Sequence, residues 1–432
     1  MKRNMRDNND ASTTRRGARS GGGKIKLILA LALAVLVIVL AVIIIMQAKQ
    51  ASAERGEAAQ SAQIAEMQAA EEQAAAEKAA AEQAAREAEE AKRMEEERAK
   101  RAAEAAQYSF YQKLAKGYDT KMLIMGDSVI DGTGASSEST TWFALLQEHI
   151  EKTYYPNGEG TFTIENAAGT GHSLFPDLLS VKDGALAADC DVAVLCYGNE
   201  DPKADFSAYF EALTRAIHLK NPDSAIIFVL ESTEGGHTER MVYVENTCAY
   251  YSIPVADTFG PYYALGEKEF FNAFADAVHP NDKGQQIYFE VMRDVIDENV
   301  TADTGKMQDM EPFSGDSGLF DNLKYIPASD FTRDGDLTYT IPADAEQEIR
   351  GVLMLDCGYP VSRETAKVIA DDILYTLPRG EAIHDTVNGD RYLFTVYRDF
   401  IFEKSLNVIF TEKSNADEFN GVYLMWPTPK ER

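Results

Sequence analysis

The sequence of 432 residues contains little cysteine and has too few basic side chains to balance its acidic ones. Its four cysteines include no Cys-x-x-Cys pair, so no disulfide framework and no cysteine-based zinc site is evident. Lys and Arg number 42 against 70 Asp and Glu, which gives a formal net charge of −28. Because binding to phosphate backbones requires a surplus of Lys and Arg, this balance argues against a nonspecific nucleic-acid-binding protein.

Charged residues are missing altogether from Leu27 to Met46, a run of 20 apolar residues. A helix of that length covers about 30 Å, the thickness of the hydrocarbon core of a bilayer. Residues 1–26 are rich in Lys and Arg, so the positive-inside rule predicts a cytoplasmic tail, a transmembrane helix over 27–47 and an extracellular remainder. The alternative is a cleaved signal peptide, because Ala51-Ser52-Ala53 resembles a cleavage site, and the protein would then be secreted.

Proline is absent from residues 48 to 107, and large apolar residues are nearly absent. The segment consists almost wholly of Ala, Glu, Gln, Lys and Arg, the strongest helix formers, so we predict a long helical stalk over 48–117. No Leu or Ile heptad seam is visible in it. Two helical arrangements therefore stay open, a solitary charged helix and an Ala-seamed coiled coil that would join copies of the chain into a homo-oligomer. A flexible acidic tether is the third alternative.

Short apolar runs alternate with amphipathic segments from about residue 118 onward. Predicted strands lie at 121–125, 162–164, 191–196 and 225–230, and predicted helices at 141–152, 206–219 and 284–296. This alternation predicts an α/β fold in which helices cover both faces of a parallel sheet. In such folds the chemistry collects at the carboxyl ends of the strands.

Four short motifs stand at these strand ends and near the last predicted helix of this region. They are Gly126-Asp127-Ser128, Asn166-Ala167-Ala168-Gly169-Thr170-Gly171, Tyr197-Gly198-Asn199-Glu200-Asp201 and Asp276-Ala277-Val278-His279. In this order they resemble the SGNH, or GDSL-type, family of serine hydrolases, and the resemblance covers residues 118–300. It implies a flavodoxin-like parallel sheet sandwiched by helices, and an esterase or acyltransferase activity.

The resemblance implies a role for each of five residues. Ser128 matches the nucleophile, His279 the base that takes its proton, and Asp276 the carboxylate that orients the imidazole. The backbone N–H groups of Ser128 and Gly171 and the side-chain amide of Asn199 match the donors of the oxyanion hole. These residues make a complete set for attack on an ester.

Other residues near the motifs are less specific. Glu200 stands where the family usually has aspartate, which predicts a slightly reshaped loop. His172 and His237 are candidate substrate-binding residues, because one follows the oxyanion glycine and the other lies in a loop after a strand; each is alternatively a loop residue without that role. His149 and the remaining histidines lack metal-ligand spacing, so neither a metal nor a cofactor is expected.

The region after residue 300 begins with a polar, turn-rich segment, 301–318, which we interpret as a linker. A β-rich or α+β domain of unknown role is predicted over 319–432, with one helix from Ser362 to Tyr375. Its predicted strands lie at 336–341, 352–355, 392–397, 400–402, 407–410 and 422–426. A carbohydrate-binding module and a packing or assembly domain are both compatible with this pattern.

The sequence thus predicts a membrane-tethered extracellular serine esterase that cleaves small acyl groups, chiefly O-acetyl groups, from carbohydrate or cell-envelope glycan through an acyl-enzyme. The first alternative is an O-acyltransferase that uses the same acyl-enzyme with a sugar acceptor. The second is a catalytically idle sugar-binding or scaffold protein on a stalk. The expected partners are an acylated carbohydrate or other ester substrate and, through one N-terminal helix, a membrane.

Overall fold

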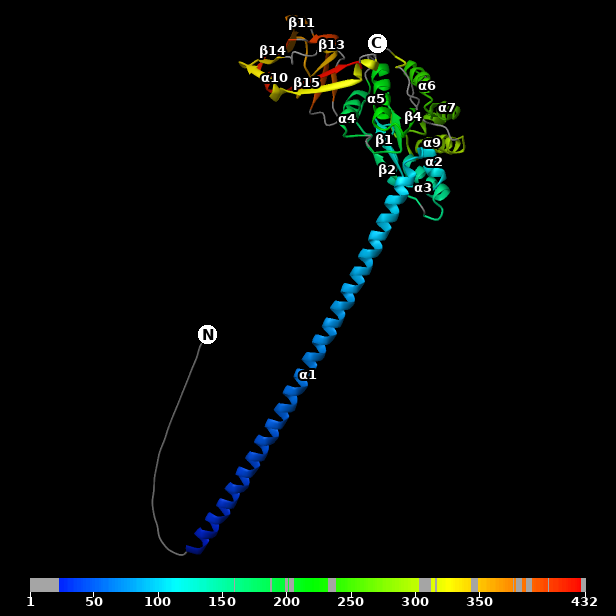
Figure 1. Cartoon of the computed structure of the whole chain (residues 1–432). Helices are drawn as coiled ribbons and strands as arrows, with labels where there is room; N and C mark the ends of the chain where they lie inside the picture. The colour runs from blue at the N-terminus through cyan, green and yellow to red at the C-terminus, as the bar shows by residue number, and fades with distance from the viewer. Residues whose placement is uncertain are drawn as a thin grey trace. The chain divides into compact units, whose positions relative to one another are not determined.

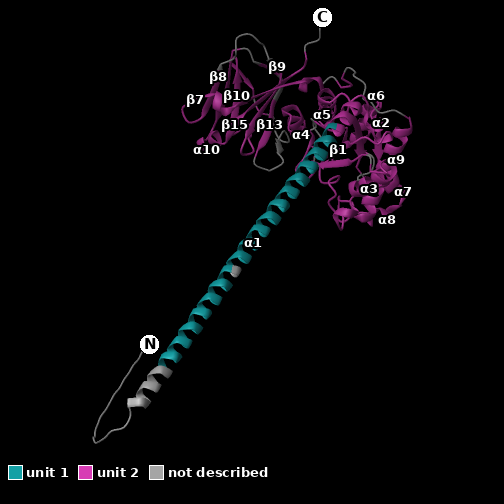
Figure 2. Ribbon diagram, turned by 60° about the horizontal axis from the view of Figure 1, so that its bottom comes forward, with its two compact units in different colours: residues 1–96 teal, residues 97–432 magenta. Residues whose placement is uncertain are grey.

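The computed structural model describes residues 23–158, 160–186, 189–198, 201, 206–231, 238–302, 312–314, 317–342, 349–375, 377, 383–385, 391–402 and 404–428. The chain divides into two compact units, Met1–Glu96 and Glu97–Arg432, which Figure 2 shows in different colours.

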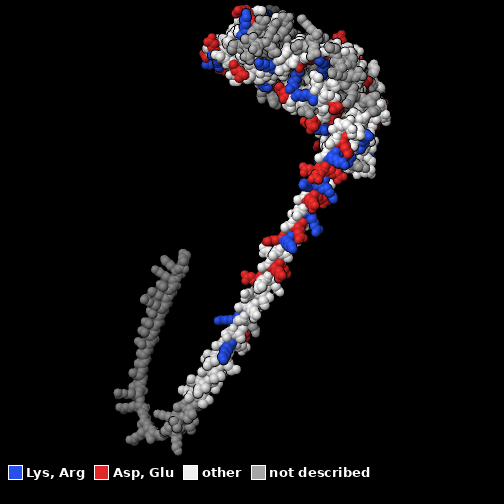
Figure 3. Space-filling view, in the orientation of Figure 1, with Lys and Arg blue, Asp and Glu red and all other residues white. Residues whose placement is uncertain are grey.

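The first unit consists of most of helix α1, which extends from Gly23 to Ala105 (Figure 1). Large apolar side chains in the part of the helix between Leu33 and Met46 are exposed, and helix α1 as a whole passes the test of length and composition for a helix that could cross a membrane. Figure 3 shows no charged side chain along that part and a mixture of acidic and basic side chains beyond it. The helix predicted after the apolar run is therefore present as far as Ala105.

A five-stranded parallel sheet forms the centre of the second unit. Its order is β2-β1-β3-β4-β5, with bounds Phe162–Asn166, Thr120–Gly126, Val192–Cys196, Ala225–Leu230 and Val255–Asp257. The four predicted strands are confirmed. Three of them, β1, β3 and β4, are almost wholly apolar runs, and β2 pairs with β1. The short strand β5 gave too little periodicity to be recognised, and it is held by its pairing with β4.

Helices cover both faces of this sheet. On one face lie α2 (Phe110–Ala115), α3 (Trp142–Tyr154) and α9 (Asp282–Ala302); on the other lie α4 (Leu174–Asp183), α5 (Phe206–Lys220) and α6 (Glu239–Tyr251). Two short helices, α7 (Phe259–Ala264) and α8 (Glu267–Phe271), precede α9. Successive residues of β1 point to opposite faces, as a strand requires, so Met122 and Leu123 belong to different core clusters.

Helix α2 corrects one predicted boundary. The predicted stalk range 48–117 includes α2, yet the side chains of Phe110, Tyr111 and Leu114 are at most 1% exposed and belong to the core beneath the sheet. Ser109 caps this helix by accepting a hydrogen bond from the backbone N–H of Gln112. Aromatic residues at this point of the sequence, after the Ala-rich segment, were the signal that the stalk had ended.

The C-terminal region is a sandwich of two five-stranded antiparallel sheets around its own core. One sheet has the order β12-β13-β9-β15-β6, with bounds Ile383–Asp385, Tyr392–Phe402, Ile349–Cys357, Phe419–Trp426 and Asn322–Pro327. The other has the order β11-β10-β14-β8-β7, with bounds Ile373–Tyr375, Ala366–Ala370, Ser405–Phe410, Thr338–Pro342 and Thr332–Asp334. The predicted strands at 392–397 and 400–402 are one strand, β13, interrupted by register shifts.

The helix predicted from Ser362 to Tyr375 is wrong, because this segment forms the hairpin of β10 and β11. Ala370 pairs with Ile373, and the two residues between them, Asp371 and Asp372, have φ angles of 50° and 70°. A two-residue hairpin turn of type I′ has positive φ at both positions, which aspartate tolerates better than most residues. The β-branched residues on either side of Asp-Asp carried this signal in the sequence.

The outer face of the β9 sheet packs against the α4 and α5 side of the parallel sheet. Met354, Leu393 and Met425 from the sandwich are buried in the same hydrophobic cluster as the residues of α4 and α5. At the edge of this contact the carboxylate of Asp321 forms an ion pair with the guanidinium of Arg215, at 2.8 Å. The C-terminal region therefore shares a core with the parallel-sheet region.

Candidate active site

Ser128 follows β1 in a tightly fixed turn. The preceding Gly126 has a φ of 151°, and a Cβ there would lie 2.1 Å from the carbonyl oxygen of Cys196, so only glycine fits. The buried carboxylate of Asp127 accepts a hydrogen bond from the backbone N–H of Val129 at 2.9 Å. These contacts hold the turn in which Ser128, 3% exposed, presents its hydroxyl.

Asp276 and His279 lie on one turn between α8 and α9. One carboxylate oxygen of Asp276 accepts hydrogen bonds from the backbone N–H groups of His279 and Val278, both at 2.9 Å. The other accepts from Nδ1 of His279 at 2.7 Å. The backbone hydrogen bond from His279, followed by the one from Val278, lowers the pKa of Asp276 to about 2.

The structure brings the nucleophile candidate and the base candidate together across the sheet edge. Nε2 of His279 lies 2.9 Å from Oγ of Ser128, although the two residues are 151 positions apart. Since Nδ1 donates to the carboxylate, Nε2 of the neutral ring is an acceptor that points at the hydroxyl proton. The three residues therefore form a continuous chain that can move a proton from Ser128 to His279.

Two of the predicted oxyanion donors, Ser128 and Gly171, lie in the segments that follow the paired strands β1 and β2. Gly171, with a φ of 85°, lies between β2 and α4. Asn199 lies outside the described residues, but its neighbour Gly198 is placed. Gly126 pairs with Cys196, and the N–H of Asp127 donates to the carbonyl of Cys196 at 3.3 Å, so Ser128 and Gly198 follow adjacent, paired strand ends.

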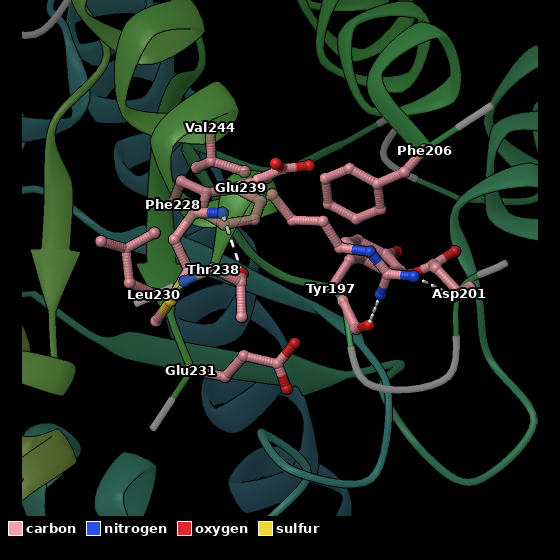
Figure 4. Close-up of a pocket in the computed structure, with 12 residues that line it drawn as sticks. Tyr197, Asp201, Phe206, Phe228, Leu230, Glu231, Thr238, Glu239 and Val244 are labelled. Carbon is pink, nitrogen blue, oxygen red and sulfur yellow. Dashed lines mark hydrogen bonds between the residues drawn. The ribbon is translucent and has the colours of Figure 1, made fainter. Parts of the chain in front are cut away.

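Arg240 anchors the segment after β3, a feature that the sequence did not reveal. Its guanidinium donates to the carbonyl oxygen of Gly198 and, at 2.8 Å, to that of Asp201 (Figure 4). It also lies over the ring of Phe206 at 5.1 Å from the centroid. Arg240 belongs to the first turn of α6, a helix that the sequence analysis did not predict, so nothing pointed to this contact.

Figure 4 shows the cavity that these residues line, about 720 Å³ in volume, at the carboxyl ends of β3 and β4. Its wall is largely apolar, and the carboxyl groups of Asp201 and Glu231 are both only 7% exposed. Burial raises the pKa of Asp201 to about 7. The cavity thus holds a carboxyl group whose pKa lies near 7, and neither Ser128 nor His279 is among the residues that line it.

His172 contacts buried polar groups. Its Nδ1 lies 2.9 Å from one carboxylate oxygen of Asp177, and the other oxygen accepts from the hydroxyl of Tyr197 at 2.6 Å. Asp177 is fully buried. The second histidine candidate, His237, lies outside the described residues.

The described residues contain no group of three or more His, Cys, Asp and Glu side chains that could hold a metal ion. His149 instead contacts Asp297 of α9 at 3.1 Å. The four cysteines are buried and free, and burial raises the pKa of the Cys190 thiol to about 11.

Comparison with solved structures shows that this chain shares the fold of a known esterase. A two-domain esterase (CEX) active on acetylated mannans matches with a TM-score of 0.54 and 16% identity, over 76% of this chain and 96% of that one. The same esterase co-crystallised with mannopentaose gives a TM-score of 0.53 and 14% identity, over 77% and 96%. The acetylxylan esterase Axe2 from Geobacillus stearothermophilus matches with a TM-score of 0.35 and 19% identity, over 42% and 96%. No protein-family model and no curated protein matches the sequence.

Proposed function

We propose that the protein is a serine esterase of the SGNH type that removes small acyl groups, chiefly O-acetyl groups, from carbohydrate. The observation that carries the proposal is the hydrogen-bonded chain from Ser128 through His279 to Asp276. The shared two-domain fold of an esterase active on acetylated mannans supports carbohydrate as the substrate class.

In the proposed reaction, Oγ of Ser128 attacks the ester carbonyl while Nε2 of His279 takes its proton. The imidazolium returns that proton to the leaving sugar oxygen, and water then hydrolyses the acyl-enzyme. The carboxylate of Asp276, whose pKa is about 2, stays ionised and stabilises the imidazolium. The N–H groups of Ser128 and Gly171 and the amide of Asn199 are the proposed donors to the oxyanion; losing one such donor typically costs about 2.7–4 kcal/mol.

The apolar part of α1 is the proposed membrane anchor, with the esterase on the extracellular side. The basic residues before the apolar run and the mixed charges after it support this orientation. An acyltransferase would use the same acyl-enzyme, with a sugar hydroxyl in place of water. A catalytically idle scaffold would not need the hydrogen bond between Ser128 and His279.

The proposal is tested on the full chain in detergent with a fluorophosphonate probe and with acetate release from acetylated mannan, acetylated xylan and O-acetylated peptidoglycan. We expect the wild type to be labelled and to release acetate from at least one glycan, and Ser128→Ala to do neither. Ser139→Ala, which changes an exposed serine, is the matched control. Full acetate release by Ser128→Ala would refute the site, an unlabelled wild type would favour the scaffold, and acetylated product from an added sugar would indicate transfer.

A further inference from the structure

Ser128 and His279 reach each other from two segments that are far apart in the sequence. Ser128 belongs to the segment between β1 and α3, and His279 to the segment between α8 and α9. Their 2.9 Å contact therefore depends on whatever holds these two segments together. A displacement of about 1 Å at such a contact can cost about 100-fold in rate.

The side chain of Gln285, in the first turn of α9, joins the two segments. Its Oε1 accepts a hydrogen bond from the backbone N–H of Trp142 at 3.0 Å, at the start of α3. Its Nε2 donates to the carbonyl oxygen of Pro280 at 3.1 Å and lies 3.5 Å from that of Thr133. Gln285 is 0% exposed, so water does not compete for these bonds.

Only an amide matches this surrounding. Its oxygen faces an N–H group and its nitrogen faces two carbonyl oxygens. A carboxylate at this position would be repelled by the two carbonyl oxygens. A thioether would leave the N–H group and both carbonyl oxygens without this hydrogen-bond partner. The loss of either half of the amide would therefore remove a buried bond between the segments and leave the exposed ones that Asp282 accepts from Ser136 and Thr140.

The two segments also touch directly, so a shift of one is passed to the other. A Cβ on Gly134 would lie 2.5 Å from the carbonyl oxygen of Pro280 and 3.1 Å from Cβ of His279. The indole Nε1 of Trp142 donates to the carbonyl oxygen of Ile130 at 2.8 Å, two residues after Ser128. Gln285 thus acts on both sides of the contact between Ser128 and His279, through Trp142 on one and through Pro280 on the other.

We propose that Gln285 is a positioning residue that keeps the base aligned with the nucleophile. The proposal rests on the proposed esterase function, because it assigns to Gln285 the alignment of that same pair. Gln285 contacts neither substrate nor the reacting atoms; it acts through the backbone of the residues around them.

The test compares Gln285→Met and Gln285→Glu with the matched variant Gln286→Met in the full chain. The side chain of Gln286 is exposed and donates to Glu290 on its own helix. We expect Gln285→Met to lower kcat for p-nitrophenyl acetate and the rate of fluorophosphonate labelling by about 10- to 100-fold, with KM within about twofold. For Gln285→Glu the rate relative to wild type should recover as the pH falls, because protonation gives the introduced carboxyl a donor for the carbonyl of Pro280.

Circular dichroism at the assay temperature establishes that each variant is folded. A folded Gln285→Met with the labelling rate and kcat of the wild type would overturn the proposal. If neither Gln285 variant folds, Trp142→Phe removes the bond to Ile130, and an unchanged labelling rate in that variant would overturn the proposal that Gln285 acts on the Ser128 segment through Trp142. Failure of the proposed function has a different signature, since the wild type itself would then not be labelled at Ser128.

Discussion

The substitution Asp201→Asn should stabilise the protein, by an amount that grows as the pH rises. One carboxyl oxygen of Asp201 accepts a hydrogen bond from the N–H of Leu174 at 2.8 Å, while the other is buried without a hydrogen-bond partner among the described residues. Burial raises the pKa of this group from 3.8 to about 7. Between pH 3.8 and about 7 the folded protein therefore keeps a proton that the unfolded chain releases. The stability that this proton contributes is fully present below pH 3.8 and is lost as the pH rises through about 7.

The expected magnitude follows from that shift. Each unit of pKa difference is worth about 1.36 kcal/mol. The free energy of unfolding of Asp201→Asn should therefore exceed that of the wild type by a margin that grows by about 2.5 kcal/mol between pH 5 and pH 8. Urea unfolding followed by circular dichroism at several pH values measures this, and Asp330→Asn, which changes an exposed aspartate, is the control. If the difference in free energy of unfolding between wild type and Asp201→Asn stays constant over this pH range, burial does not raise the pKa of Asp201 and the reasoning is refuted.

Three further predictions concern other single residues. Glu211→Ala should lower the free energy of unfolding by about 3 kcal/mol in urea titrations, because the buried carboxylate accepts from the N–H groups of Phe313 and Ser314 at 2.5 and 2.8 Å; a loss below that of an exposed glutamate would contradict this. Asp276→Asn should lower kcat for p-nitrophenyl acetate by up to about 10,000-fold with little change in KM, since the imidazolium loses its counter-charge; steady-state kinetics at wild-type level would argue against its role. Asp372→Gly should stabilise the β10–β11 hairpin by roughly 0.5–1 kcal/mol in thermal unfolding, because glycine adopts its φ of 70° without strain; a lower melting temperature would contradict the turn assignment.

The parallel sheet could be predicted because its strands carry their signal locally. Strand β4 is a run of six buried apolar residues, and the predicted bounds 225–230 agree with the structure. The chemical motifs at Ser128 and His279 were likewise visible, since they stand directly beside such elements. Their mutual distance, in contrast, is a long-range property that only the coordinates supply.

The residues that support the site could not be predicted for the same reason. Gln285 and Arg240 are ordinary polar residues in the first turns of helices, and their partners lie far away in the sequence. The sequence predicts a helix across Asp371 because a serine cap and charged residues outweigh the turn signal. Helical propensity is a weak preference, and the pairing of β10 with β14 overrides it.

The placement of Asp276 only three residues before His279 makes half of the proposed catalytic unit local. Its internal geometry is set by one turn, so it survives distortions of the sheet that would separate more distant partners. A substitution that shifts this turn as a unit should therefore change the distance from His279 to Ser128 while the bond from His279 to Asp276 stays intact.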